Sequence, residues 1–276
     1  MTRKPAVVTA GWQEVSDSLA RTGIFKENQL NPETVPRILG DFVRRYTTII
    51  GYGIDGELNP IGSGTFLRKT DGQHGILTAG HVIGAIKTKE NILVLANQDR
   101  EEVTWIGIEG AGMEGHGEAN DGPRGPDIGW MPLSGEEVER LEALGAVFSN
   151  RAREREAFLG QVCQISIVFG FVEEASDLHN KLVVAHGMLI GKTGELDADE
   201  EGWDYSEYAI TNDDPWIPRT HGGVSGSAIW RIDLPMDCTG RKAVILEGVV
   251  FAEGPEDDRK LIAHGKNSVR IILDER

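Results

Sequence analysis

The chain has 276 residues, a formal net charge of −16 at pH 7 and 35 glycines. This length accommodates one large domain or two small ones around a substantial core. The acidic balance argues against nucleic acid or an anionic membrane as the main partner, and no apolar run of the sequence is long enough to span a membrane. Short apolar runs punctuated by Gly, Pro and Asp turns predict an all-β protein.

The first 45 residues differ from this pattern and predict a helical extension, residues 1–45. Apolar residues around Leu19 have the spacing of a short amphipathic helix, and Pro32 is typical of the first position of a second one. Ile38, Leu39, Phe42 and Val43 give that second helix an apolar face. We expect the extension to pack against the body of the protein. A pro-segment, or an arm that docks a regulatory partner, is the alternative.

Six strands are predicted next, and the first chemically informative residues of the chain lie among them. An Asp71-Gly72 turn predicts a hairpin between two of these strands. The second hairpin strand leads into Thr78-Ala79-Gly80-His81, and a histidine at the end of a buried strand is well placed to act as a general base. Asp127 stands at the head of the last apolar run of this half. The predicted strands are residues 47–52, 64–68, 75–79, 91–95, 103–108 and 128–133.

A helical segment is predicted to link the two halves, at residues 135–160. Ser134 and Glu137 form the pattern of a capping box, in which each side chain bonds the other residue's backbone N–H. Apolar residues at three- and four-residue spacing follow, which indicates one or two helices.

Six further strands are predicted in the second half, together with the most informative stretch of the chain. Gly222-Gly223-Val224-Ser225-Gly226 places a serine between glycines, which lets backbone N–H groups converge beside its hydroxyl. A serine oxygen beside such N–H groups provides a nucleophile and an oxyanion site for acyl transfer. The predicted strands are residues 162–171, 181–191, 208–211, 227–230, 243–251 and 267–273.

The three segments around His81, Asp127 and Ser225 resemble, in this order, the signatures of chymotrypsin-fold (trypsin-like) serine peptidases. Gly-Val-Ser-Gly-Ser is most similar to the bacterial branch that includes the glutamyl endopeptidases. The resemblance implies two six-stranded antiparallel β-barrels, here residues 46–134 and 161–276, with the active site between them. It also implies that Ser225 is the nucleophile, His81 the general acid/base and Asp127 the orienting carboxylate. The N–H groups of Gly223 and Ser225 would form the oxyanion hole.

The function expected from this resemblance is that of a serine endopeptidase acting on protein or peptide substrates through an acyl-enzyme. A catalytically silent peptide-binding module of the same fold, and an esterase using the same triad, remain alternatives. In the digestive-type enzymes of this fold an aspartate before the nucleophile captures a newly cut N-terminus. Val224 cannot form that ion pair, so we expect no activation by this route. The site is expected to be preformed, or else controlled by something that the sequence does not show.

The sequence gives two opposite indications about specificity. By the resemblance, the pocket for the residue before the scissile bond is bordered by Arg219, His221 and the strand containing Val250. Arg219 or His221 in that pocket would favour an acidic residue. Residues 195–214 are dense in carboxylates and would favour basic substrates if they border the cleft. Both possibilities stay open.

No cofactor or metal motif is found: the histidines lack tight ligand spacing, and no phosphate-binding loop occurs. The start of the chain has too short an apolar stretch for a signal peptide. This predicts a cytoplasmic bacterial protein, in which Cys163 and Cys238 are expected to be thiols, although a disulfide between them is the alternative.

Overall fold

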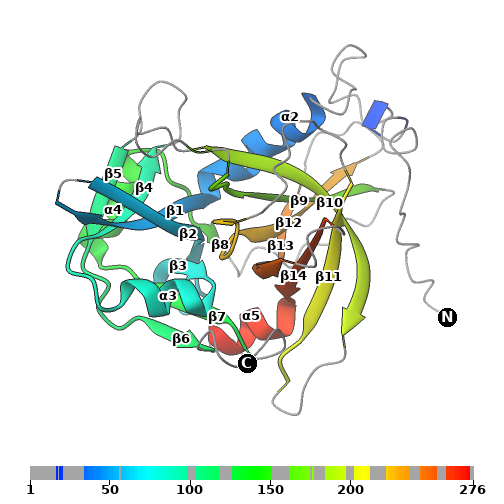
Figure 1. The fold of residues 1–276 in the computed structure, drawn as a ribbon. Coiled ribbons are helices and arrows are strands. Elements are labelled where there is room, and N and C mark those ends of the chain that lie inside the picture. Colours follow the sequence, from blue (N-terminus) through cyan, green and yellow to red (C-terminus); the bar gives the residue numbers. More distant parts are fainter. Residues whose placement is uncertain are drawn as a thin grey trace.

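The computed structural model describes residues 17, 19–20, 34–55, 57–97, 104–117, 126–150, 162–174, 176, 184–196, 202–211, 222–235, 243–253 and 259–273. These residues form two β units that lie side by side, with short helices on their outer faces (Figure 1). The predicted all-β architecture with short helices is therefore confirmed in outline.

The first unit is an eight-stranded sheet. Its strands follow the order β5-β4-β1-β2-β3-β7-β6, with β8 pairing in parallel with β2. The Asp71-Gly72 turn forms as predicted, because Gly72 has a φ of +97° and the Asp71 carboxylate accepts the N–H of Gln73 at 2.9 Å. The strands are β1 (Thr47–Ile54), β2 (Glu57–Arg68), β3 (His74–Thr78), β4 (Ile92–Asn97), β5 (Thr104–Ile108), β6 (Glu114–His116), β7 (Ile128–Pro132) and β8 (Ser149–Asn150).

The prediction of a closed six-stranded barrel in the first half is wrong. Within the described residues, the edge strands β5 and β6 do not pair with each other, so the sheet stays open. β6 is only three residues long and all three are exposed. A strand this short and this exposed offers few ladder hydrogen bonds and no apolar face with which to close a barrel.

The second unit is a closed antiparallel barrel of six strands, as predicted. Its strands follow the order β10-β11-β14-β13-β12-β9. Closure leaves no free sheet edge, and Figure 1 shows this barrel beside the open sheet. The strands are β9 (Val162–Phe171), β10 (Ala185–Leu196), β11 (Tyr205–Ile210), β12 (Ala228–Pro235), β13 (Ala243–Glu253) and β14 (Lys260–His264).

The N-terminal helix α2 (Thr34–Val43) packs on β9 and β10 of the barrel. Pro36 is tolerated because it is the third residue of the helix, where a backbone N–H has no acceptor within the helix. Leu39 and Val43 are fully buried, which confirms the predicted apolar face. A short 3₁₀ turn, η2 (Arg44–Tyr46), then leads into β1. The predicted helix start at Pro32 lies outside the described residues.

The helix after the first sheet is shorter than predicted. α4 (Gly135–Ala143) begins with the predicted capping box between Ser134 and Glu137. It ends in a Schellman motif: Gly145 has a φ of +95°, its N–H bonds to Glu142, and the N–H of Ala146 bonds to Leu141. The chain then forms β8, whereas the prediction placed helix through 135–160. Residues 151–161 lie outside the described residues.

The last predicted strand, residues 267–273, is wrong. This segment is the helix α5 (Lys266–Ile272), and the strand before it, β14, was not predicted. β-Branched residues favoured a strand, but Val269, Ile272 and Leu273 are buried at three- and four-residue spacing on one helical face. The Asp204 carboxylate accepts the N–H of Ser268 at 2.7 Å and so caps the first turn.

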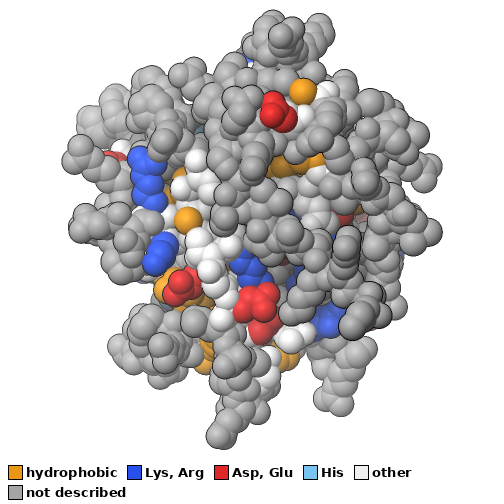
Figure 2. All heavy atoms as spheres, turned by 90° about the vertical axis from the view of Figure 1, so that its right-hand side faces the viewer, with side chains coloured by type: hydrophobic (Ala, Val, Ile, Leu, Met, Phe, Trp, Pro, Cys, Tyr) orange, Lys and Arg blue, Asp and Glu red, His pale blue; other side chains and the backbone are white. Residues whose placement is uncertain are grey.

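Among the described residues, the largest fully buried side chains are two tryptophans, one in each unit. Trp130 lies on β7 and Trp230 on β12, and the Tyr46 ring packs against Trp230 at a tilt of 41°, with ring centroids 5.3 Å apart. Figure 2, which faces the right-hand side of Figure 1, shows basic and acidic side chains interspersed among the described residues there. No helix in the described parts of the chain combines the length and apolarity needed to cross a bilayer.

Candidate active site

His81 and Asp127 are joined by two hydrogen bonds beside the end of β3 and the start of β7 (Ile128–Pro132) in the first sheet. The Asp127 Oδ2 atom lies 2.7 Å from His81 Nδ1, and its Oδ1 atom accepts the backbone N–H of His81 at 2.8 Å. The two side chains are 32% and 20% exposed, so the pair is sheltered but reachable. Both carboxylate oxygens therefore fix His81, one through its ring and one through its backbone.

Local structure brings this pair together from two neighbouring strands. β3 ends at Thr78 and leads into the short helix α3 (Gly80–Ile86), whose second residue is His81. Asp127 directly precedes β7, which pairs with β3. The sequence predicted that His81 lies at the end of a strand. In the structure β3 ends three residues earlier, at Thr78, and His81 lies in the first turn of α3, a helix that was not predicted.

Ser225 lies in a tight turn in which two nearby positions have positive φ angles that favour glycine. Gly223 and Gly226 have φ values of +88° and +89°. A β-carbon on Gly226 would collide with the carbonyl of Ser63 and the hydroxyl of Thr78. Gly226 is thus required both by its backbone conformation and by the close approach of the first sheet, and a β-carbon on Gly223 would collide with the Phe171 ring of the barrel.

The backbone of this turn is oriented by two hydrogen bonds from outside it. The N–H of Glu173 donates to the carbonyl of Gly222 at 2.9 Å, and the Ser63 hydroxyl donates to the carbonyl of Gly223 at 2.9 Å. A trans peptide directs its N–H away from its carbonyl, so the N–H of Gly223 points away from Glu173. Among the described residues, none accepts the N–H of Gly223 or Ser225.

The Ser225 hydroxyl donates to the carbonyl of Phe251 at 3.4 Å. Phe251 is the extra residue of a β-bulge in β13, between the paired residues Val250 and Ala252. Bulges re-aim backbone groups near functional sites. Among the described residues no hydrogen bond joins Ser225 and His81, and a 3.4 Å contact at a freely rotating hydroxyl is weak.

The serine turn nevertheless lies against the elements that carry His81. The N–H of Ser63, on β2, donates to the carbonyl of Ser225 at 2.8 Å. Gly62 fits so closely between Val82 and the Ser225 carbonyl that a β-carbon there would lie 2.7 Å and 2.9 Å from them. Val82 directly follows His81, so the three predicted triad residues lie in one region at the boundary of the two units.

Sequence reasoning missed His264, which also contacts this region. This last residue of β14 is fully buried, and its Nε2 atom accepts the backbone N–H of Asp127 at 2.8 Å. The signal in the sequence was an apolar run, Leu261-Ile262-Ala263, that ends in a polar ring before Gly265.

Val224, the residue before the serine, is fully buried in an apolar cluster of the barrel. The same cluster contains Val250, which is 1% exposed and bonds through its backbone to Gly226 and Ser227. Val250 stays a predicted pocket residue, and Arg219 and His221 lie outside the described residues.

Cys163 is buried on β9, while Cys238 lies outside the described residues, so their pairing stays untested. No group of three or more His, Cys, Asp or Glu residues within the described ranges is arranged to hold a metal ion.

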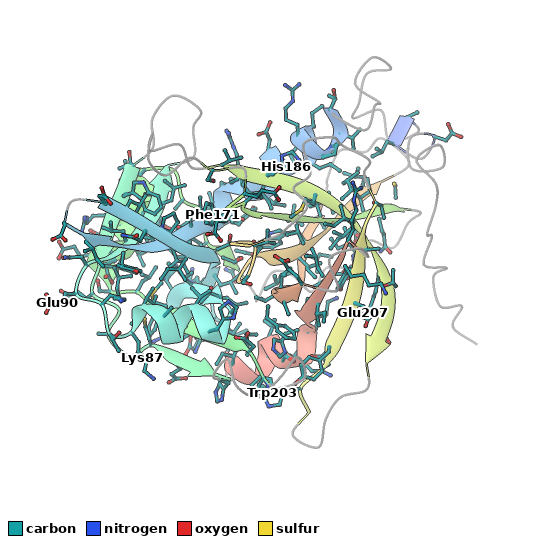
Figure 3. The ribbon with its side chains drawn as sticks, in the orientation of Figure 1. Lys87, Glu90, Phe171, His186, Trp203 and Glu207 are labelled. Carbon is teal, nitrogen blue, oxygen red and sulfur yellow. The ribbon has the colours of Figure 1, made fainter. Side chains whose placement is uncertain are left out.

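Ser63 provides a test of how the serine turn is held. The Ser63 side chain is fully buried, and besides donating to Gly223 its hydroxyl accepts the N–H of Phe171 at 2.8 Å. Figure 3 shows Phe171 near the middle of the molecule, between the two units. Ser63→Ala leaves both groups without a partner and is expected to lower the free energy of unfolding by about 1–3 kcal/mol. Urea denaturation followed by tryptophan fluorescence measures this.

The matched control is Thr65→Val on the same strand. The Thr65 side chain is fully buried, but its hydroxyl has no hydrogen-bond partner among the described residues. Removing that hydroxyl is expected to leave stability unchanged or raise it slightly. Equal stability losses in the two variants would show that the Ser63 hydrogen bonds do not hold the turn.

Sequence comparisons identify no relative: no family model matches the chain, and no curated protein matches it either. Solved structures do match, and the three described next are structures of serine proteases. The active form of the Rv3671c protease from M. tuberculosis has a TM-score of 0.50 at 12% identity, covering 100% of this chain and 92% of that one. Its inactive serine-to-alanine form has a TM-score of 0.49 at 11% identity, covering 89% and 93%. The thermostable serine protease AL20 from an extremophilic microorganism has a TM-score of 0.46 at 10% identity, covering 85% and 97%.

At this level of identity the likeness concerns the fold alone. The chain has a protease-like fold that is consistent with the chymotrypsin type, with one barrel closed and the other open. The expected relation to the glutamyl endopeptidase branch has no support from sequence comparison and stays a prediction.

Proposed function

We propose that this chain is a serine endopeptidase in which Ser225 is the nucleophile, His81 the general acid/base and Asp127 the orienting carboxylate. The observation that carries the proposal is the double contact of Asp127 with His81, at 2.7 Å to the ring and 2.8 Å to the backbone. A carboxylate bonded to Nδ1 keeps the proton on that nitrogen and leaves Nε2 free to accept another.

In the proposed reaction, Ser225 Oγ attacks the substrate carbonyl while His81 Nε2 takes the hydroxyl proton. His81 then gives this proton to the leaving amine as the C–N bond breaks, which leaves an acyl group on Ser225. Water, deprotonated by His81, then attacks the acyl group; the bond to Ser225 Oγ breaks, Oγ takes the proton from His81, and the carboxylic acid is released. Asp127 stabilises the imidazolium that forms in each half of the reaction.

The proposed oxyanion hole is formed by the N–H groups of Gly223 and Ser225. Support comes from the fixed peptide planes: Glu173 and Ser227 donate to the carbonyls of Gly222 and Val224, and these two peptides carry the N–H groups of Gly223 and Ser225. Donors that are already oriented stabilise the developing negative charge without reorganisation during the reaction. This agrees with a site that needs no ion pair at Val224 to form.

The proposed substrate is a protein or peptide bound along the boundary of the two units, residues 46–134 and 161–276. Arg219, His221 and Val250 stay the proposed pocket residues, and the preference for acidic or basic residues stays open. A regulatory partner for residues 1–45 is likewise only a proposal, as is a cytoplasmic location. The proposed chemistry uses protein groups and water at every step.

One observation bears on a second candidate, a catalytically silent peptide-binding module. The Ser225 hydroxyl donates to Phe251 and not to His81. Catalytic hydrogen bonds are often long or absent before substrate binds and tighten only in the complex, so this contact is compatible with either function. An esterase using the same triad differs only in its substrate.

A fluorophosphonate probe tests the proposal, because it reacts covalently only with an activated serine. We expect the wild-type protein to be labelled at Ser225 and the Ser225→Ala variant to remain unlabelled, as measured by in-gel fluorescence and peptide mass spectrometry. Absence of labelling in the wild type would favour the binding module. Labelling together with cleavage of small esters but not of any peptide library member would favour the esterase.

A further inference from the structure

His264 is a fully buried imidazole that the proposed reaction does not use. It is the last residue of β14, in the closed barrel, whereas His81 and Asp127 belong to the first sheet. Its position 137 residues after Asp127 makes the contact between them a link across the boundary of the two units.

The contact fixes the protonation of one ring nitrogen. His264 Nε2 lies 2.8 Å from the backbone nitrogen of Asp127. A backbone N–H can only donate, so Nε2 must be the unprotonated acceptor in this geometry. The hydrogen bond itself thus defines the tautomer of His264.

Aromatic neighbours hold the His264 ring in place. The Phe251 ring lies with its centroid 4.5 Å from that of His264, and Tyr205 and Trp203 lie at 5.0 Å and 6.1 Å. Trp203 is in turn 5.4 Å from His116 of β6, and Figure 3 shows Trp203 beside α5. An imidazole packed this way can hardly rotate away from Asp127.

Phe251 connects His264 to Ser225. The carbonyl of Phe251 accepts the Ser225 hydroxyl, while the Phe251 ring packs on His264. Asp127 is thus held at three points: its two carboxylate oxygens contact His81, and its backbone N–H contacts His264.

We propose that His264 is a positioning residue for Asp127: its Nε2 anchors the Asp127 backbone so that the carboxylate faces His81. The proposal rests on the proposed function for its consequence in catalysis. A shift of the Asp127 backbone would tilt both carboxylate contacts at once, since side chain and backbone move together. His264 acts through Asp127 and touches no reacting atom.

Three variants separate this role from simple packing. His264→Phe keeps a ring of similar shape but removes the acceptor, whereas His264→Gln can place its Oε1 atom near the former Nε2. His116→Phe changes another ring of the same aromatic group without touching Asp127. All three are compared with wild type for thermal unfolding, kcat and KM on a peptide substrate.

We expect His264→Phe to lower kcat by about 10²-fold through misplacement of Asp127, with little change in KM. His264→Gln is expected to restore most of kcat, and His116→Phe to behave as wild type. Wild-type kcat in His264→Phe would overturn the proposal. Equal losses in the Phe and Gln variants, in step with their thermal unfolding temperatures, would overturn it as well and indicate packing alone.

A spectroscopic measurement keeps the proposal testable if a variant fails to fold or the wild type proves inactive. In ¹⁵N-labelled wild-type protein we expect a scalar coupling between the Asp127 amide nitrogen and His264 Nε2 across the hydrogen bond. We also expect the His81 Nδ1 proton to resonate at low field, and this resonance to shift in His264→Phe but not in His264→Gln. A missing coupling overturns the proposal. Inactivity with the coupling present overturns only the proposed function.

Discussion

Replacing Ser225 by alanine is expected to lower kcat for peptide cleavage by on the order of 10⁶-fold, because nucleophile and base act as one unit. The fold should be retained, since among the described residues the Ser225 hydroxyl makes only the 3.4 Å contact with Phe251. Cleavage of a fluorogenic peptide library under single-turnover conditions, with circular dichroism as a check on folding, measures both expectations.

The control for this variant lies two residues further along the same turn. Ser227 is fully buried, and its hydroxyl has no hydrogen-bond partner among the described residues. Ser227→Ala keeps the backbone bonds to Val224 and Val250, so it should cleave the library about as well as wild type. If Ser225→Ala and Ser227→Ala were equally active, the assignment of the nucleophile would be wrong.

Replacing Asp127 by asparagine is expected to lower kcat by about 10⁴-fold. The amide oxygen can still accept the backbone N–H of His81, which turns the amide nitrogen toward His81 Nδ1. That nitrogen is a donor, so Nδ1 must give up its proton and Nε2 must carry it. An imidazole in this tautomer cannot accept the proton of Ser225. Steady-state kinetics on the best library peptide measures the loss.

Asp71→Asn provides a matched change of charge away from the site. Asp71 is exposed in the hairpin turn, where its Oδ1 accepts the N–H of Gln73, and an asparagine can make the same bond. This variant should retain the activity and the thermal unfolding temperature of wild type. Should Asp127→Asn behave like it, the orienting role of Asp127 would have to be abandoned.

The parts of the structure that the sequence predicted are those in which neighbours along the chain determine the geometry. The Asp71-Gly72 turn, the capping box of Ser134 and Glu137, and the glycine-flanked turn of Ser225 each depend on a few consecutive residues. Their residue types satisfy local hydrogen bonds or backbone angles directly. Eleven of the twelve predicted strands overlap strands of the structure, and the exception is residues 267–273, which form α5.

The parts that the sequence did not predict depend on contacts between distant segments. The first sheet could close only if β5 paired with β6, and these two strands are the opposite edges of the sheet. Such a pairing between distant strands cannot be read from the local sequence of either strand. The helix α5 is capped by Asp204, which lies far before it in the chain. The contact of His264 with Asp127 likewise spans 137 residues. Such pairings are set by the packing of the whole molecule, which local propensity does not describe.

The buried position of Val224 has a consequence for the conditions under which the serine turn keeps its shape. Its cluster contains one titratable side chain among the described residues, Tyr208, and burial raises the pKa of Tyr208 so that its phenol stays neutral. Dispersion and the hydrophobic effect hold Val224 in place, and neither depends on pH or is screened by dilute salt. A turn anchored by an ion pair would loosen in alkaline solution as its amine loses the proton. The turn of Ser225 has no such weakness.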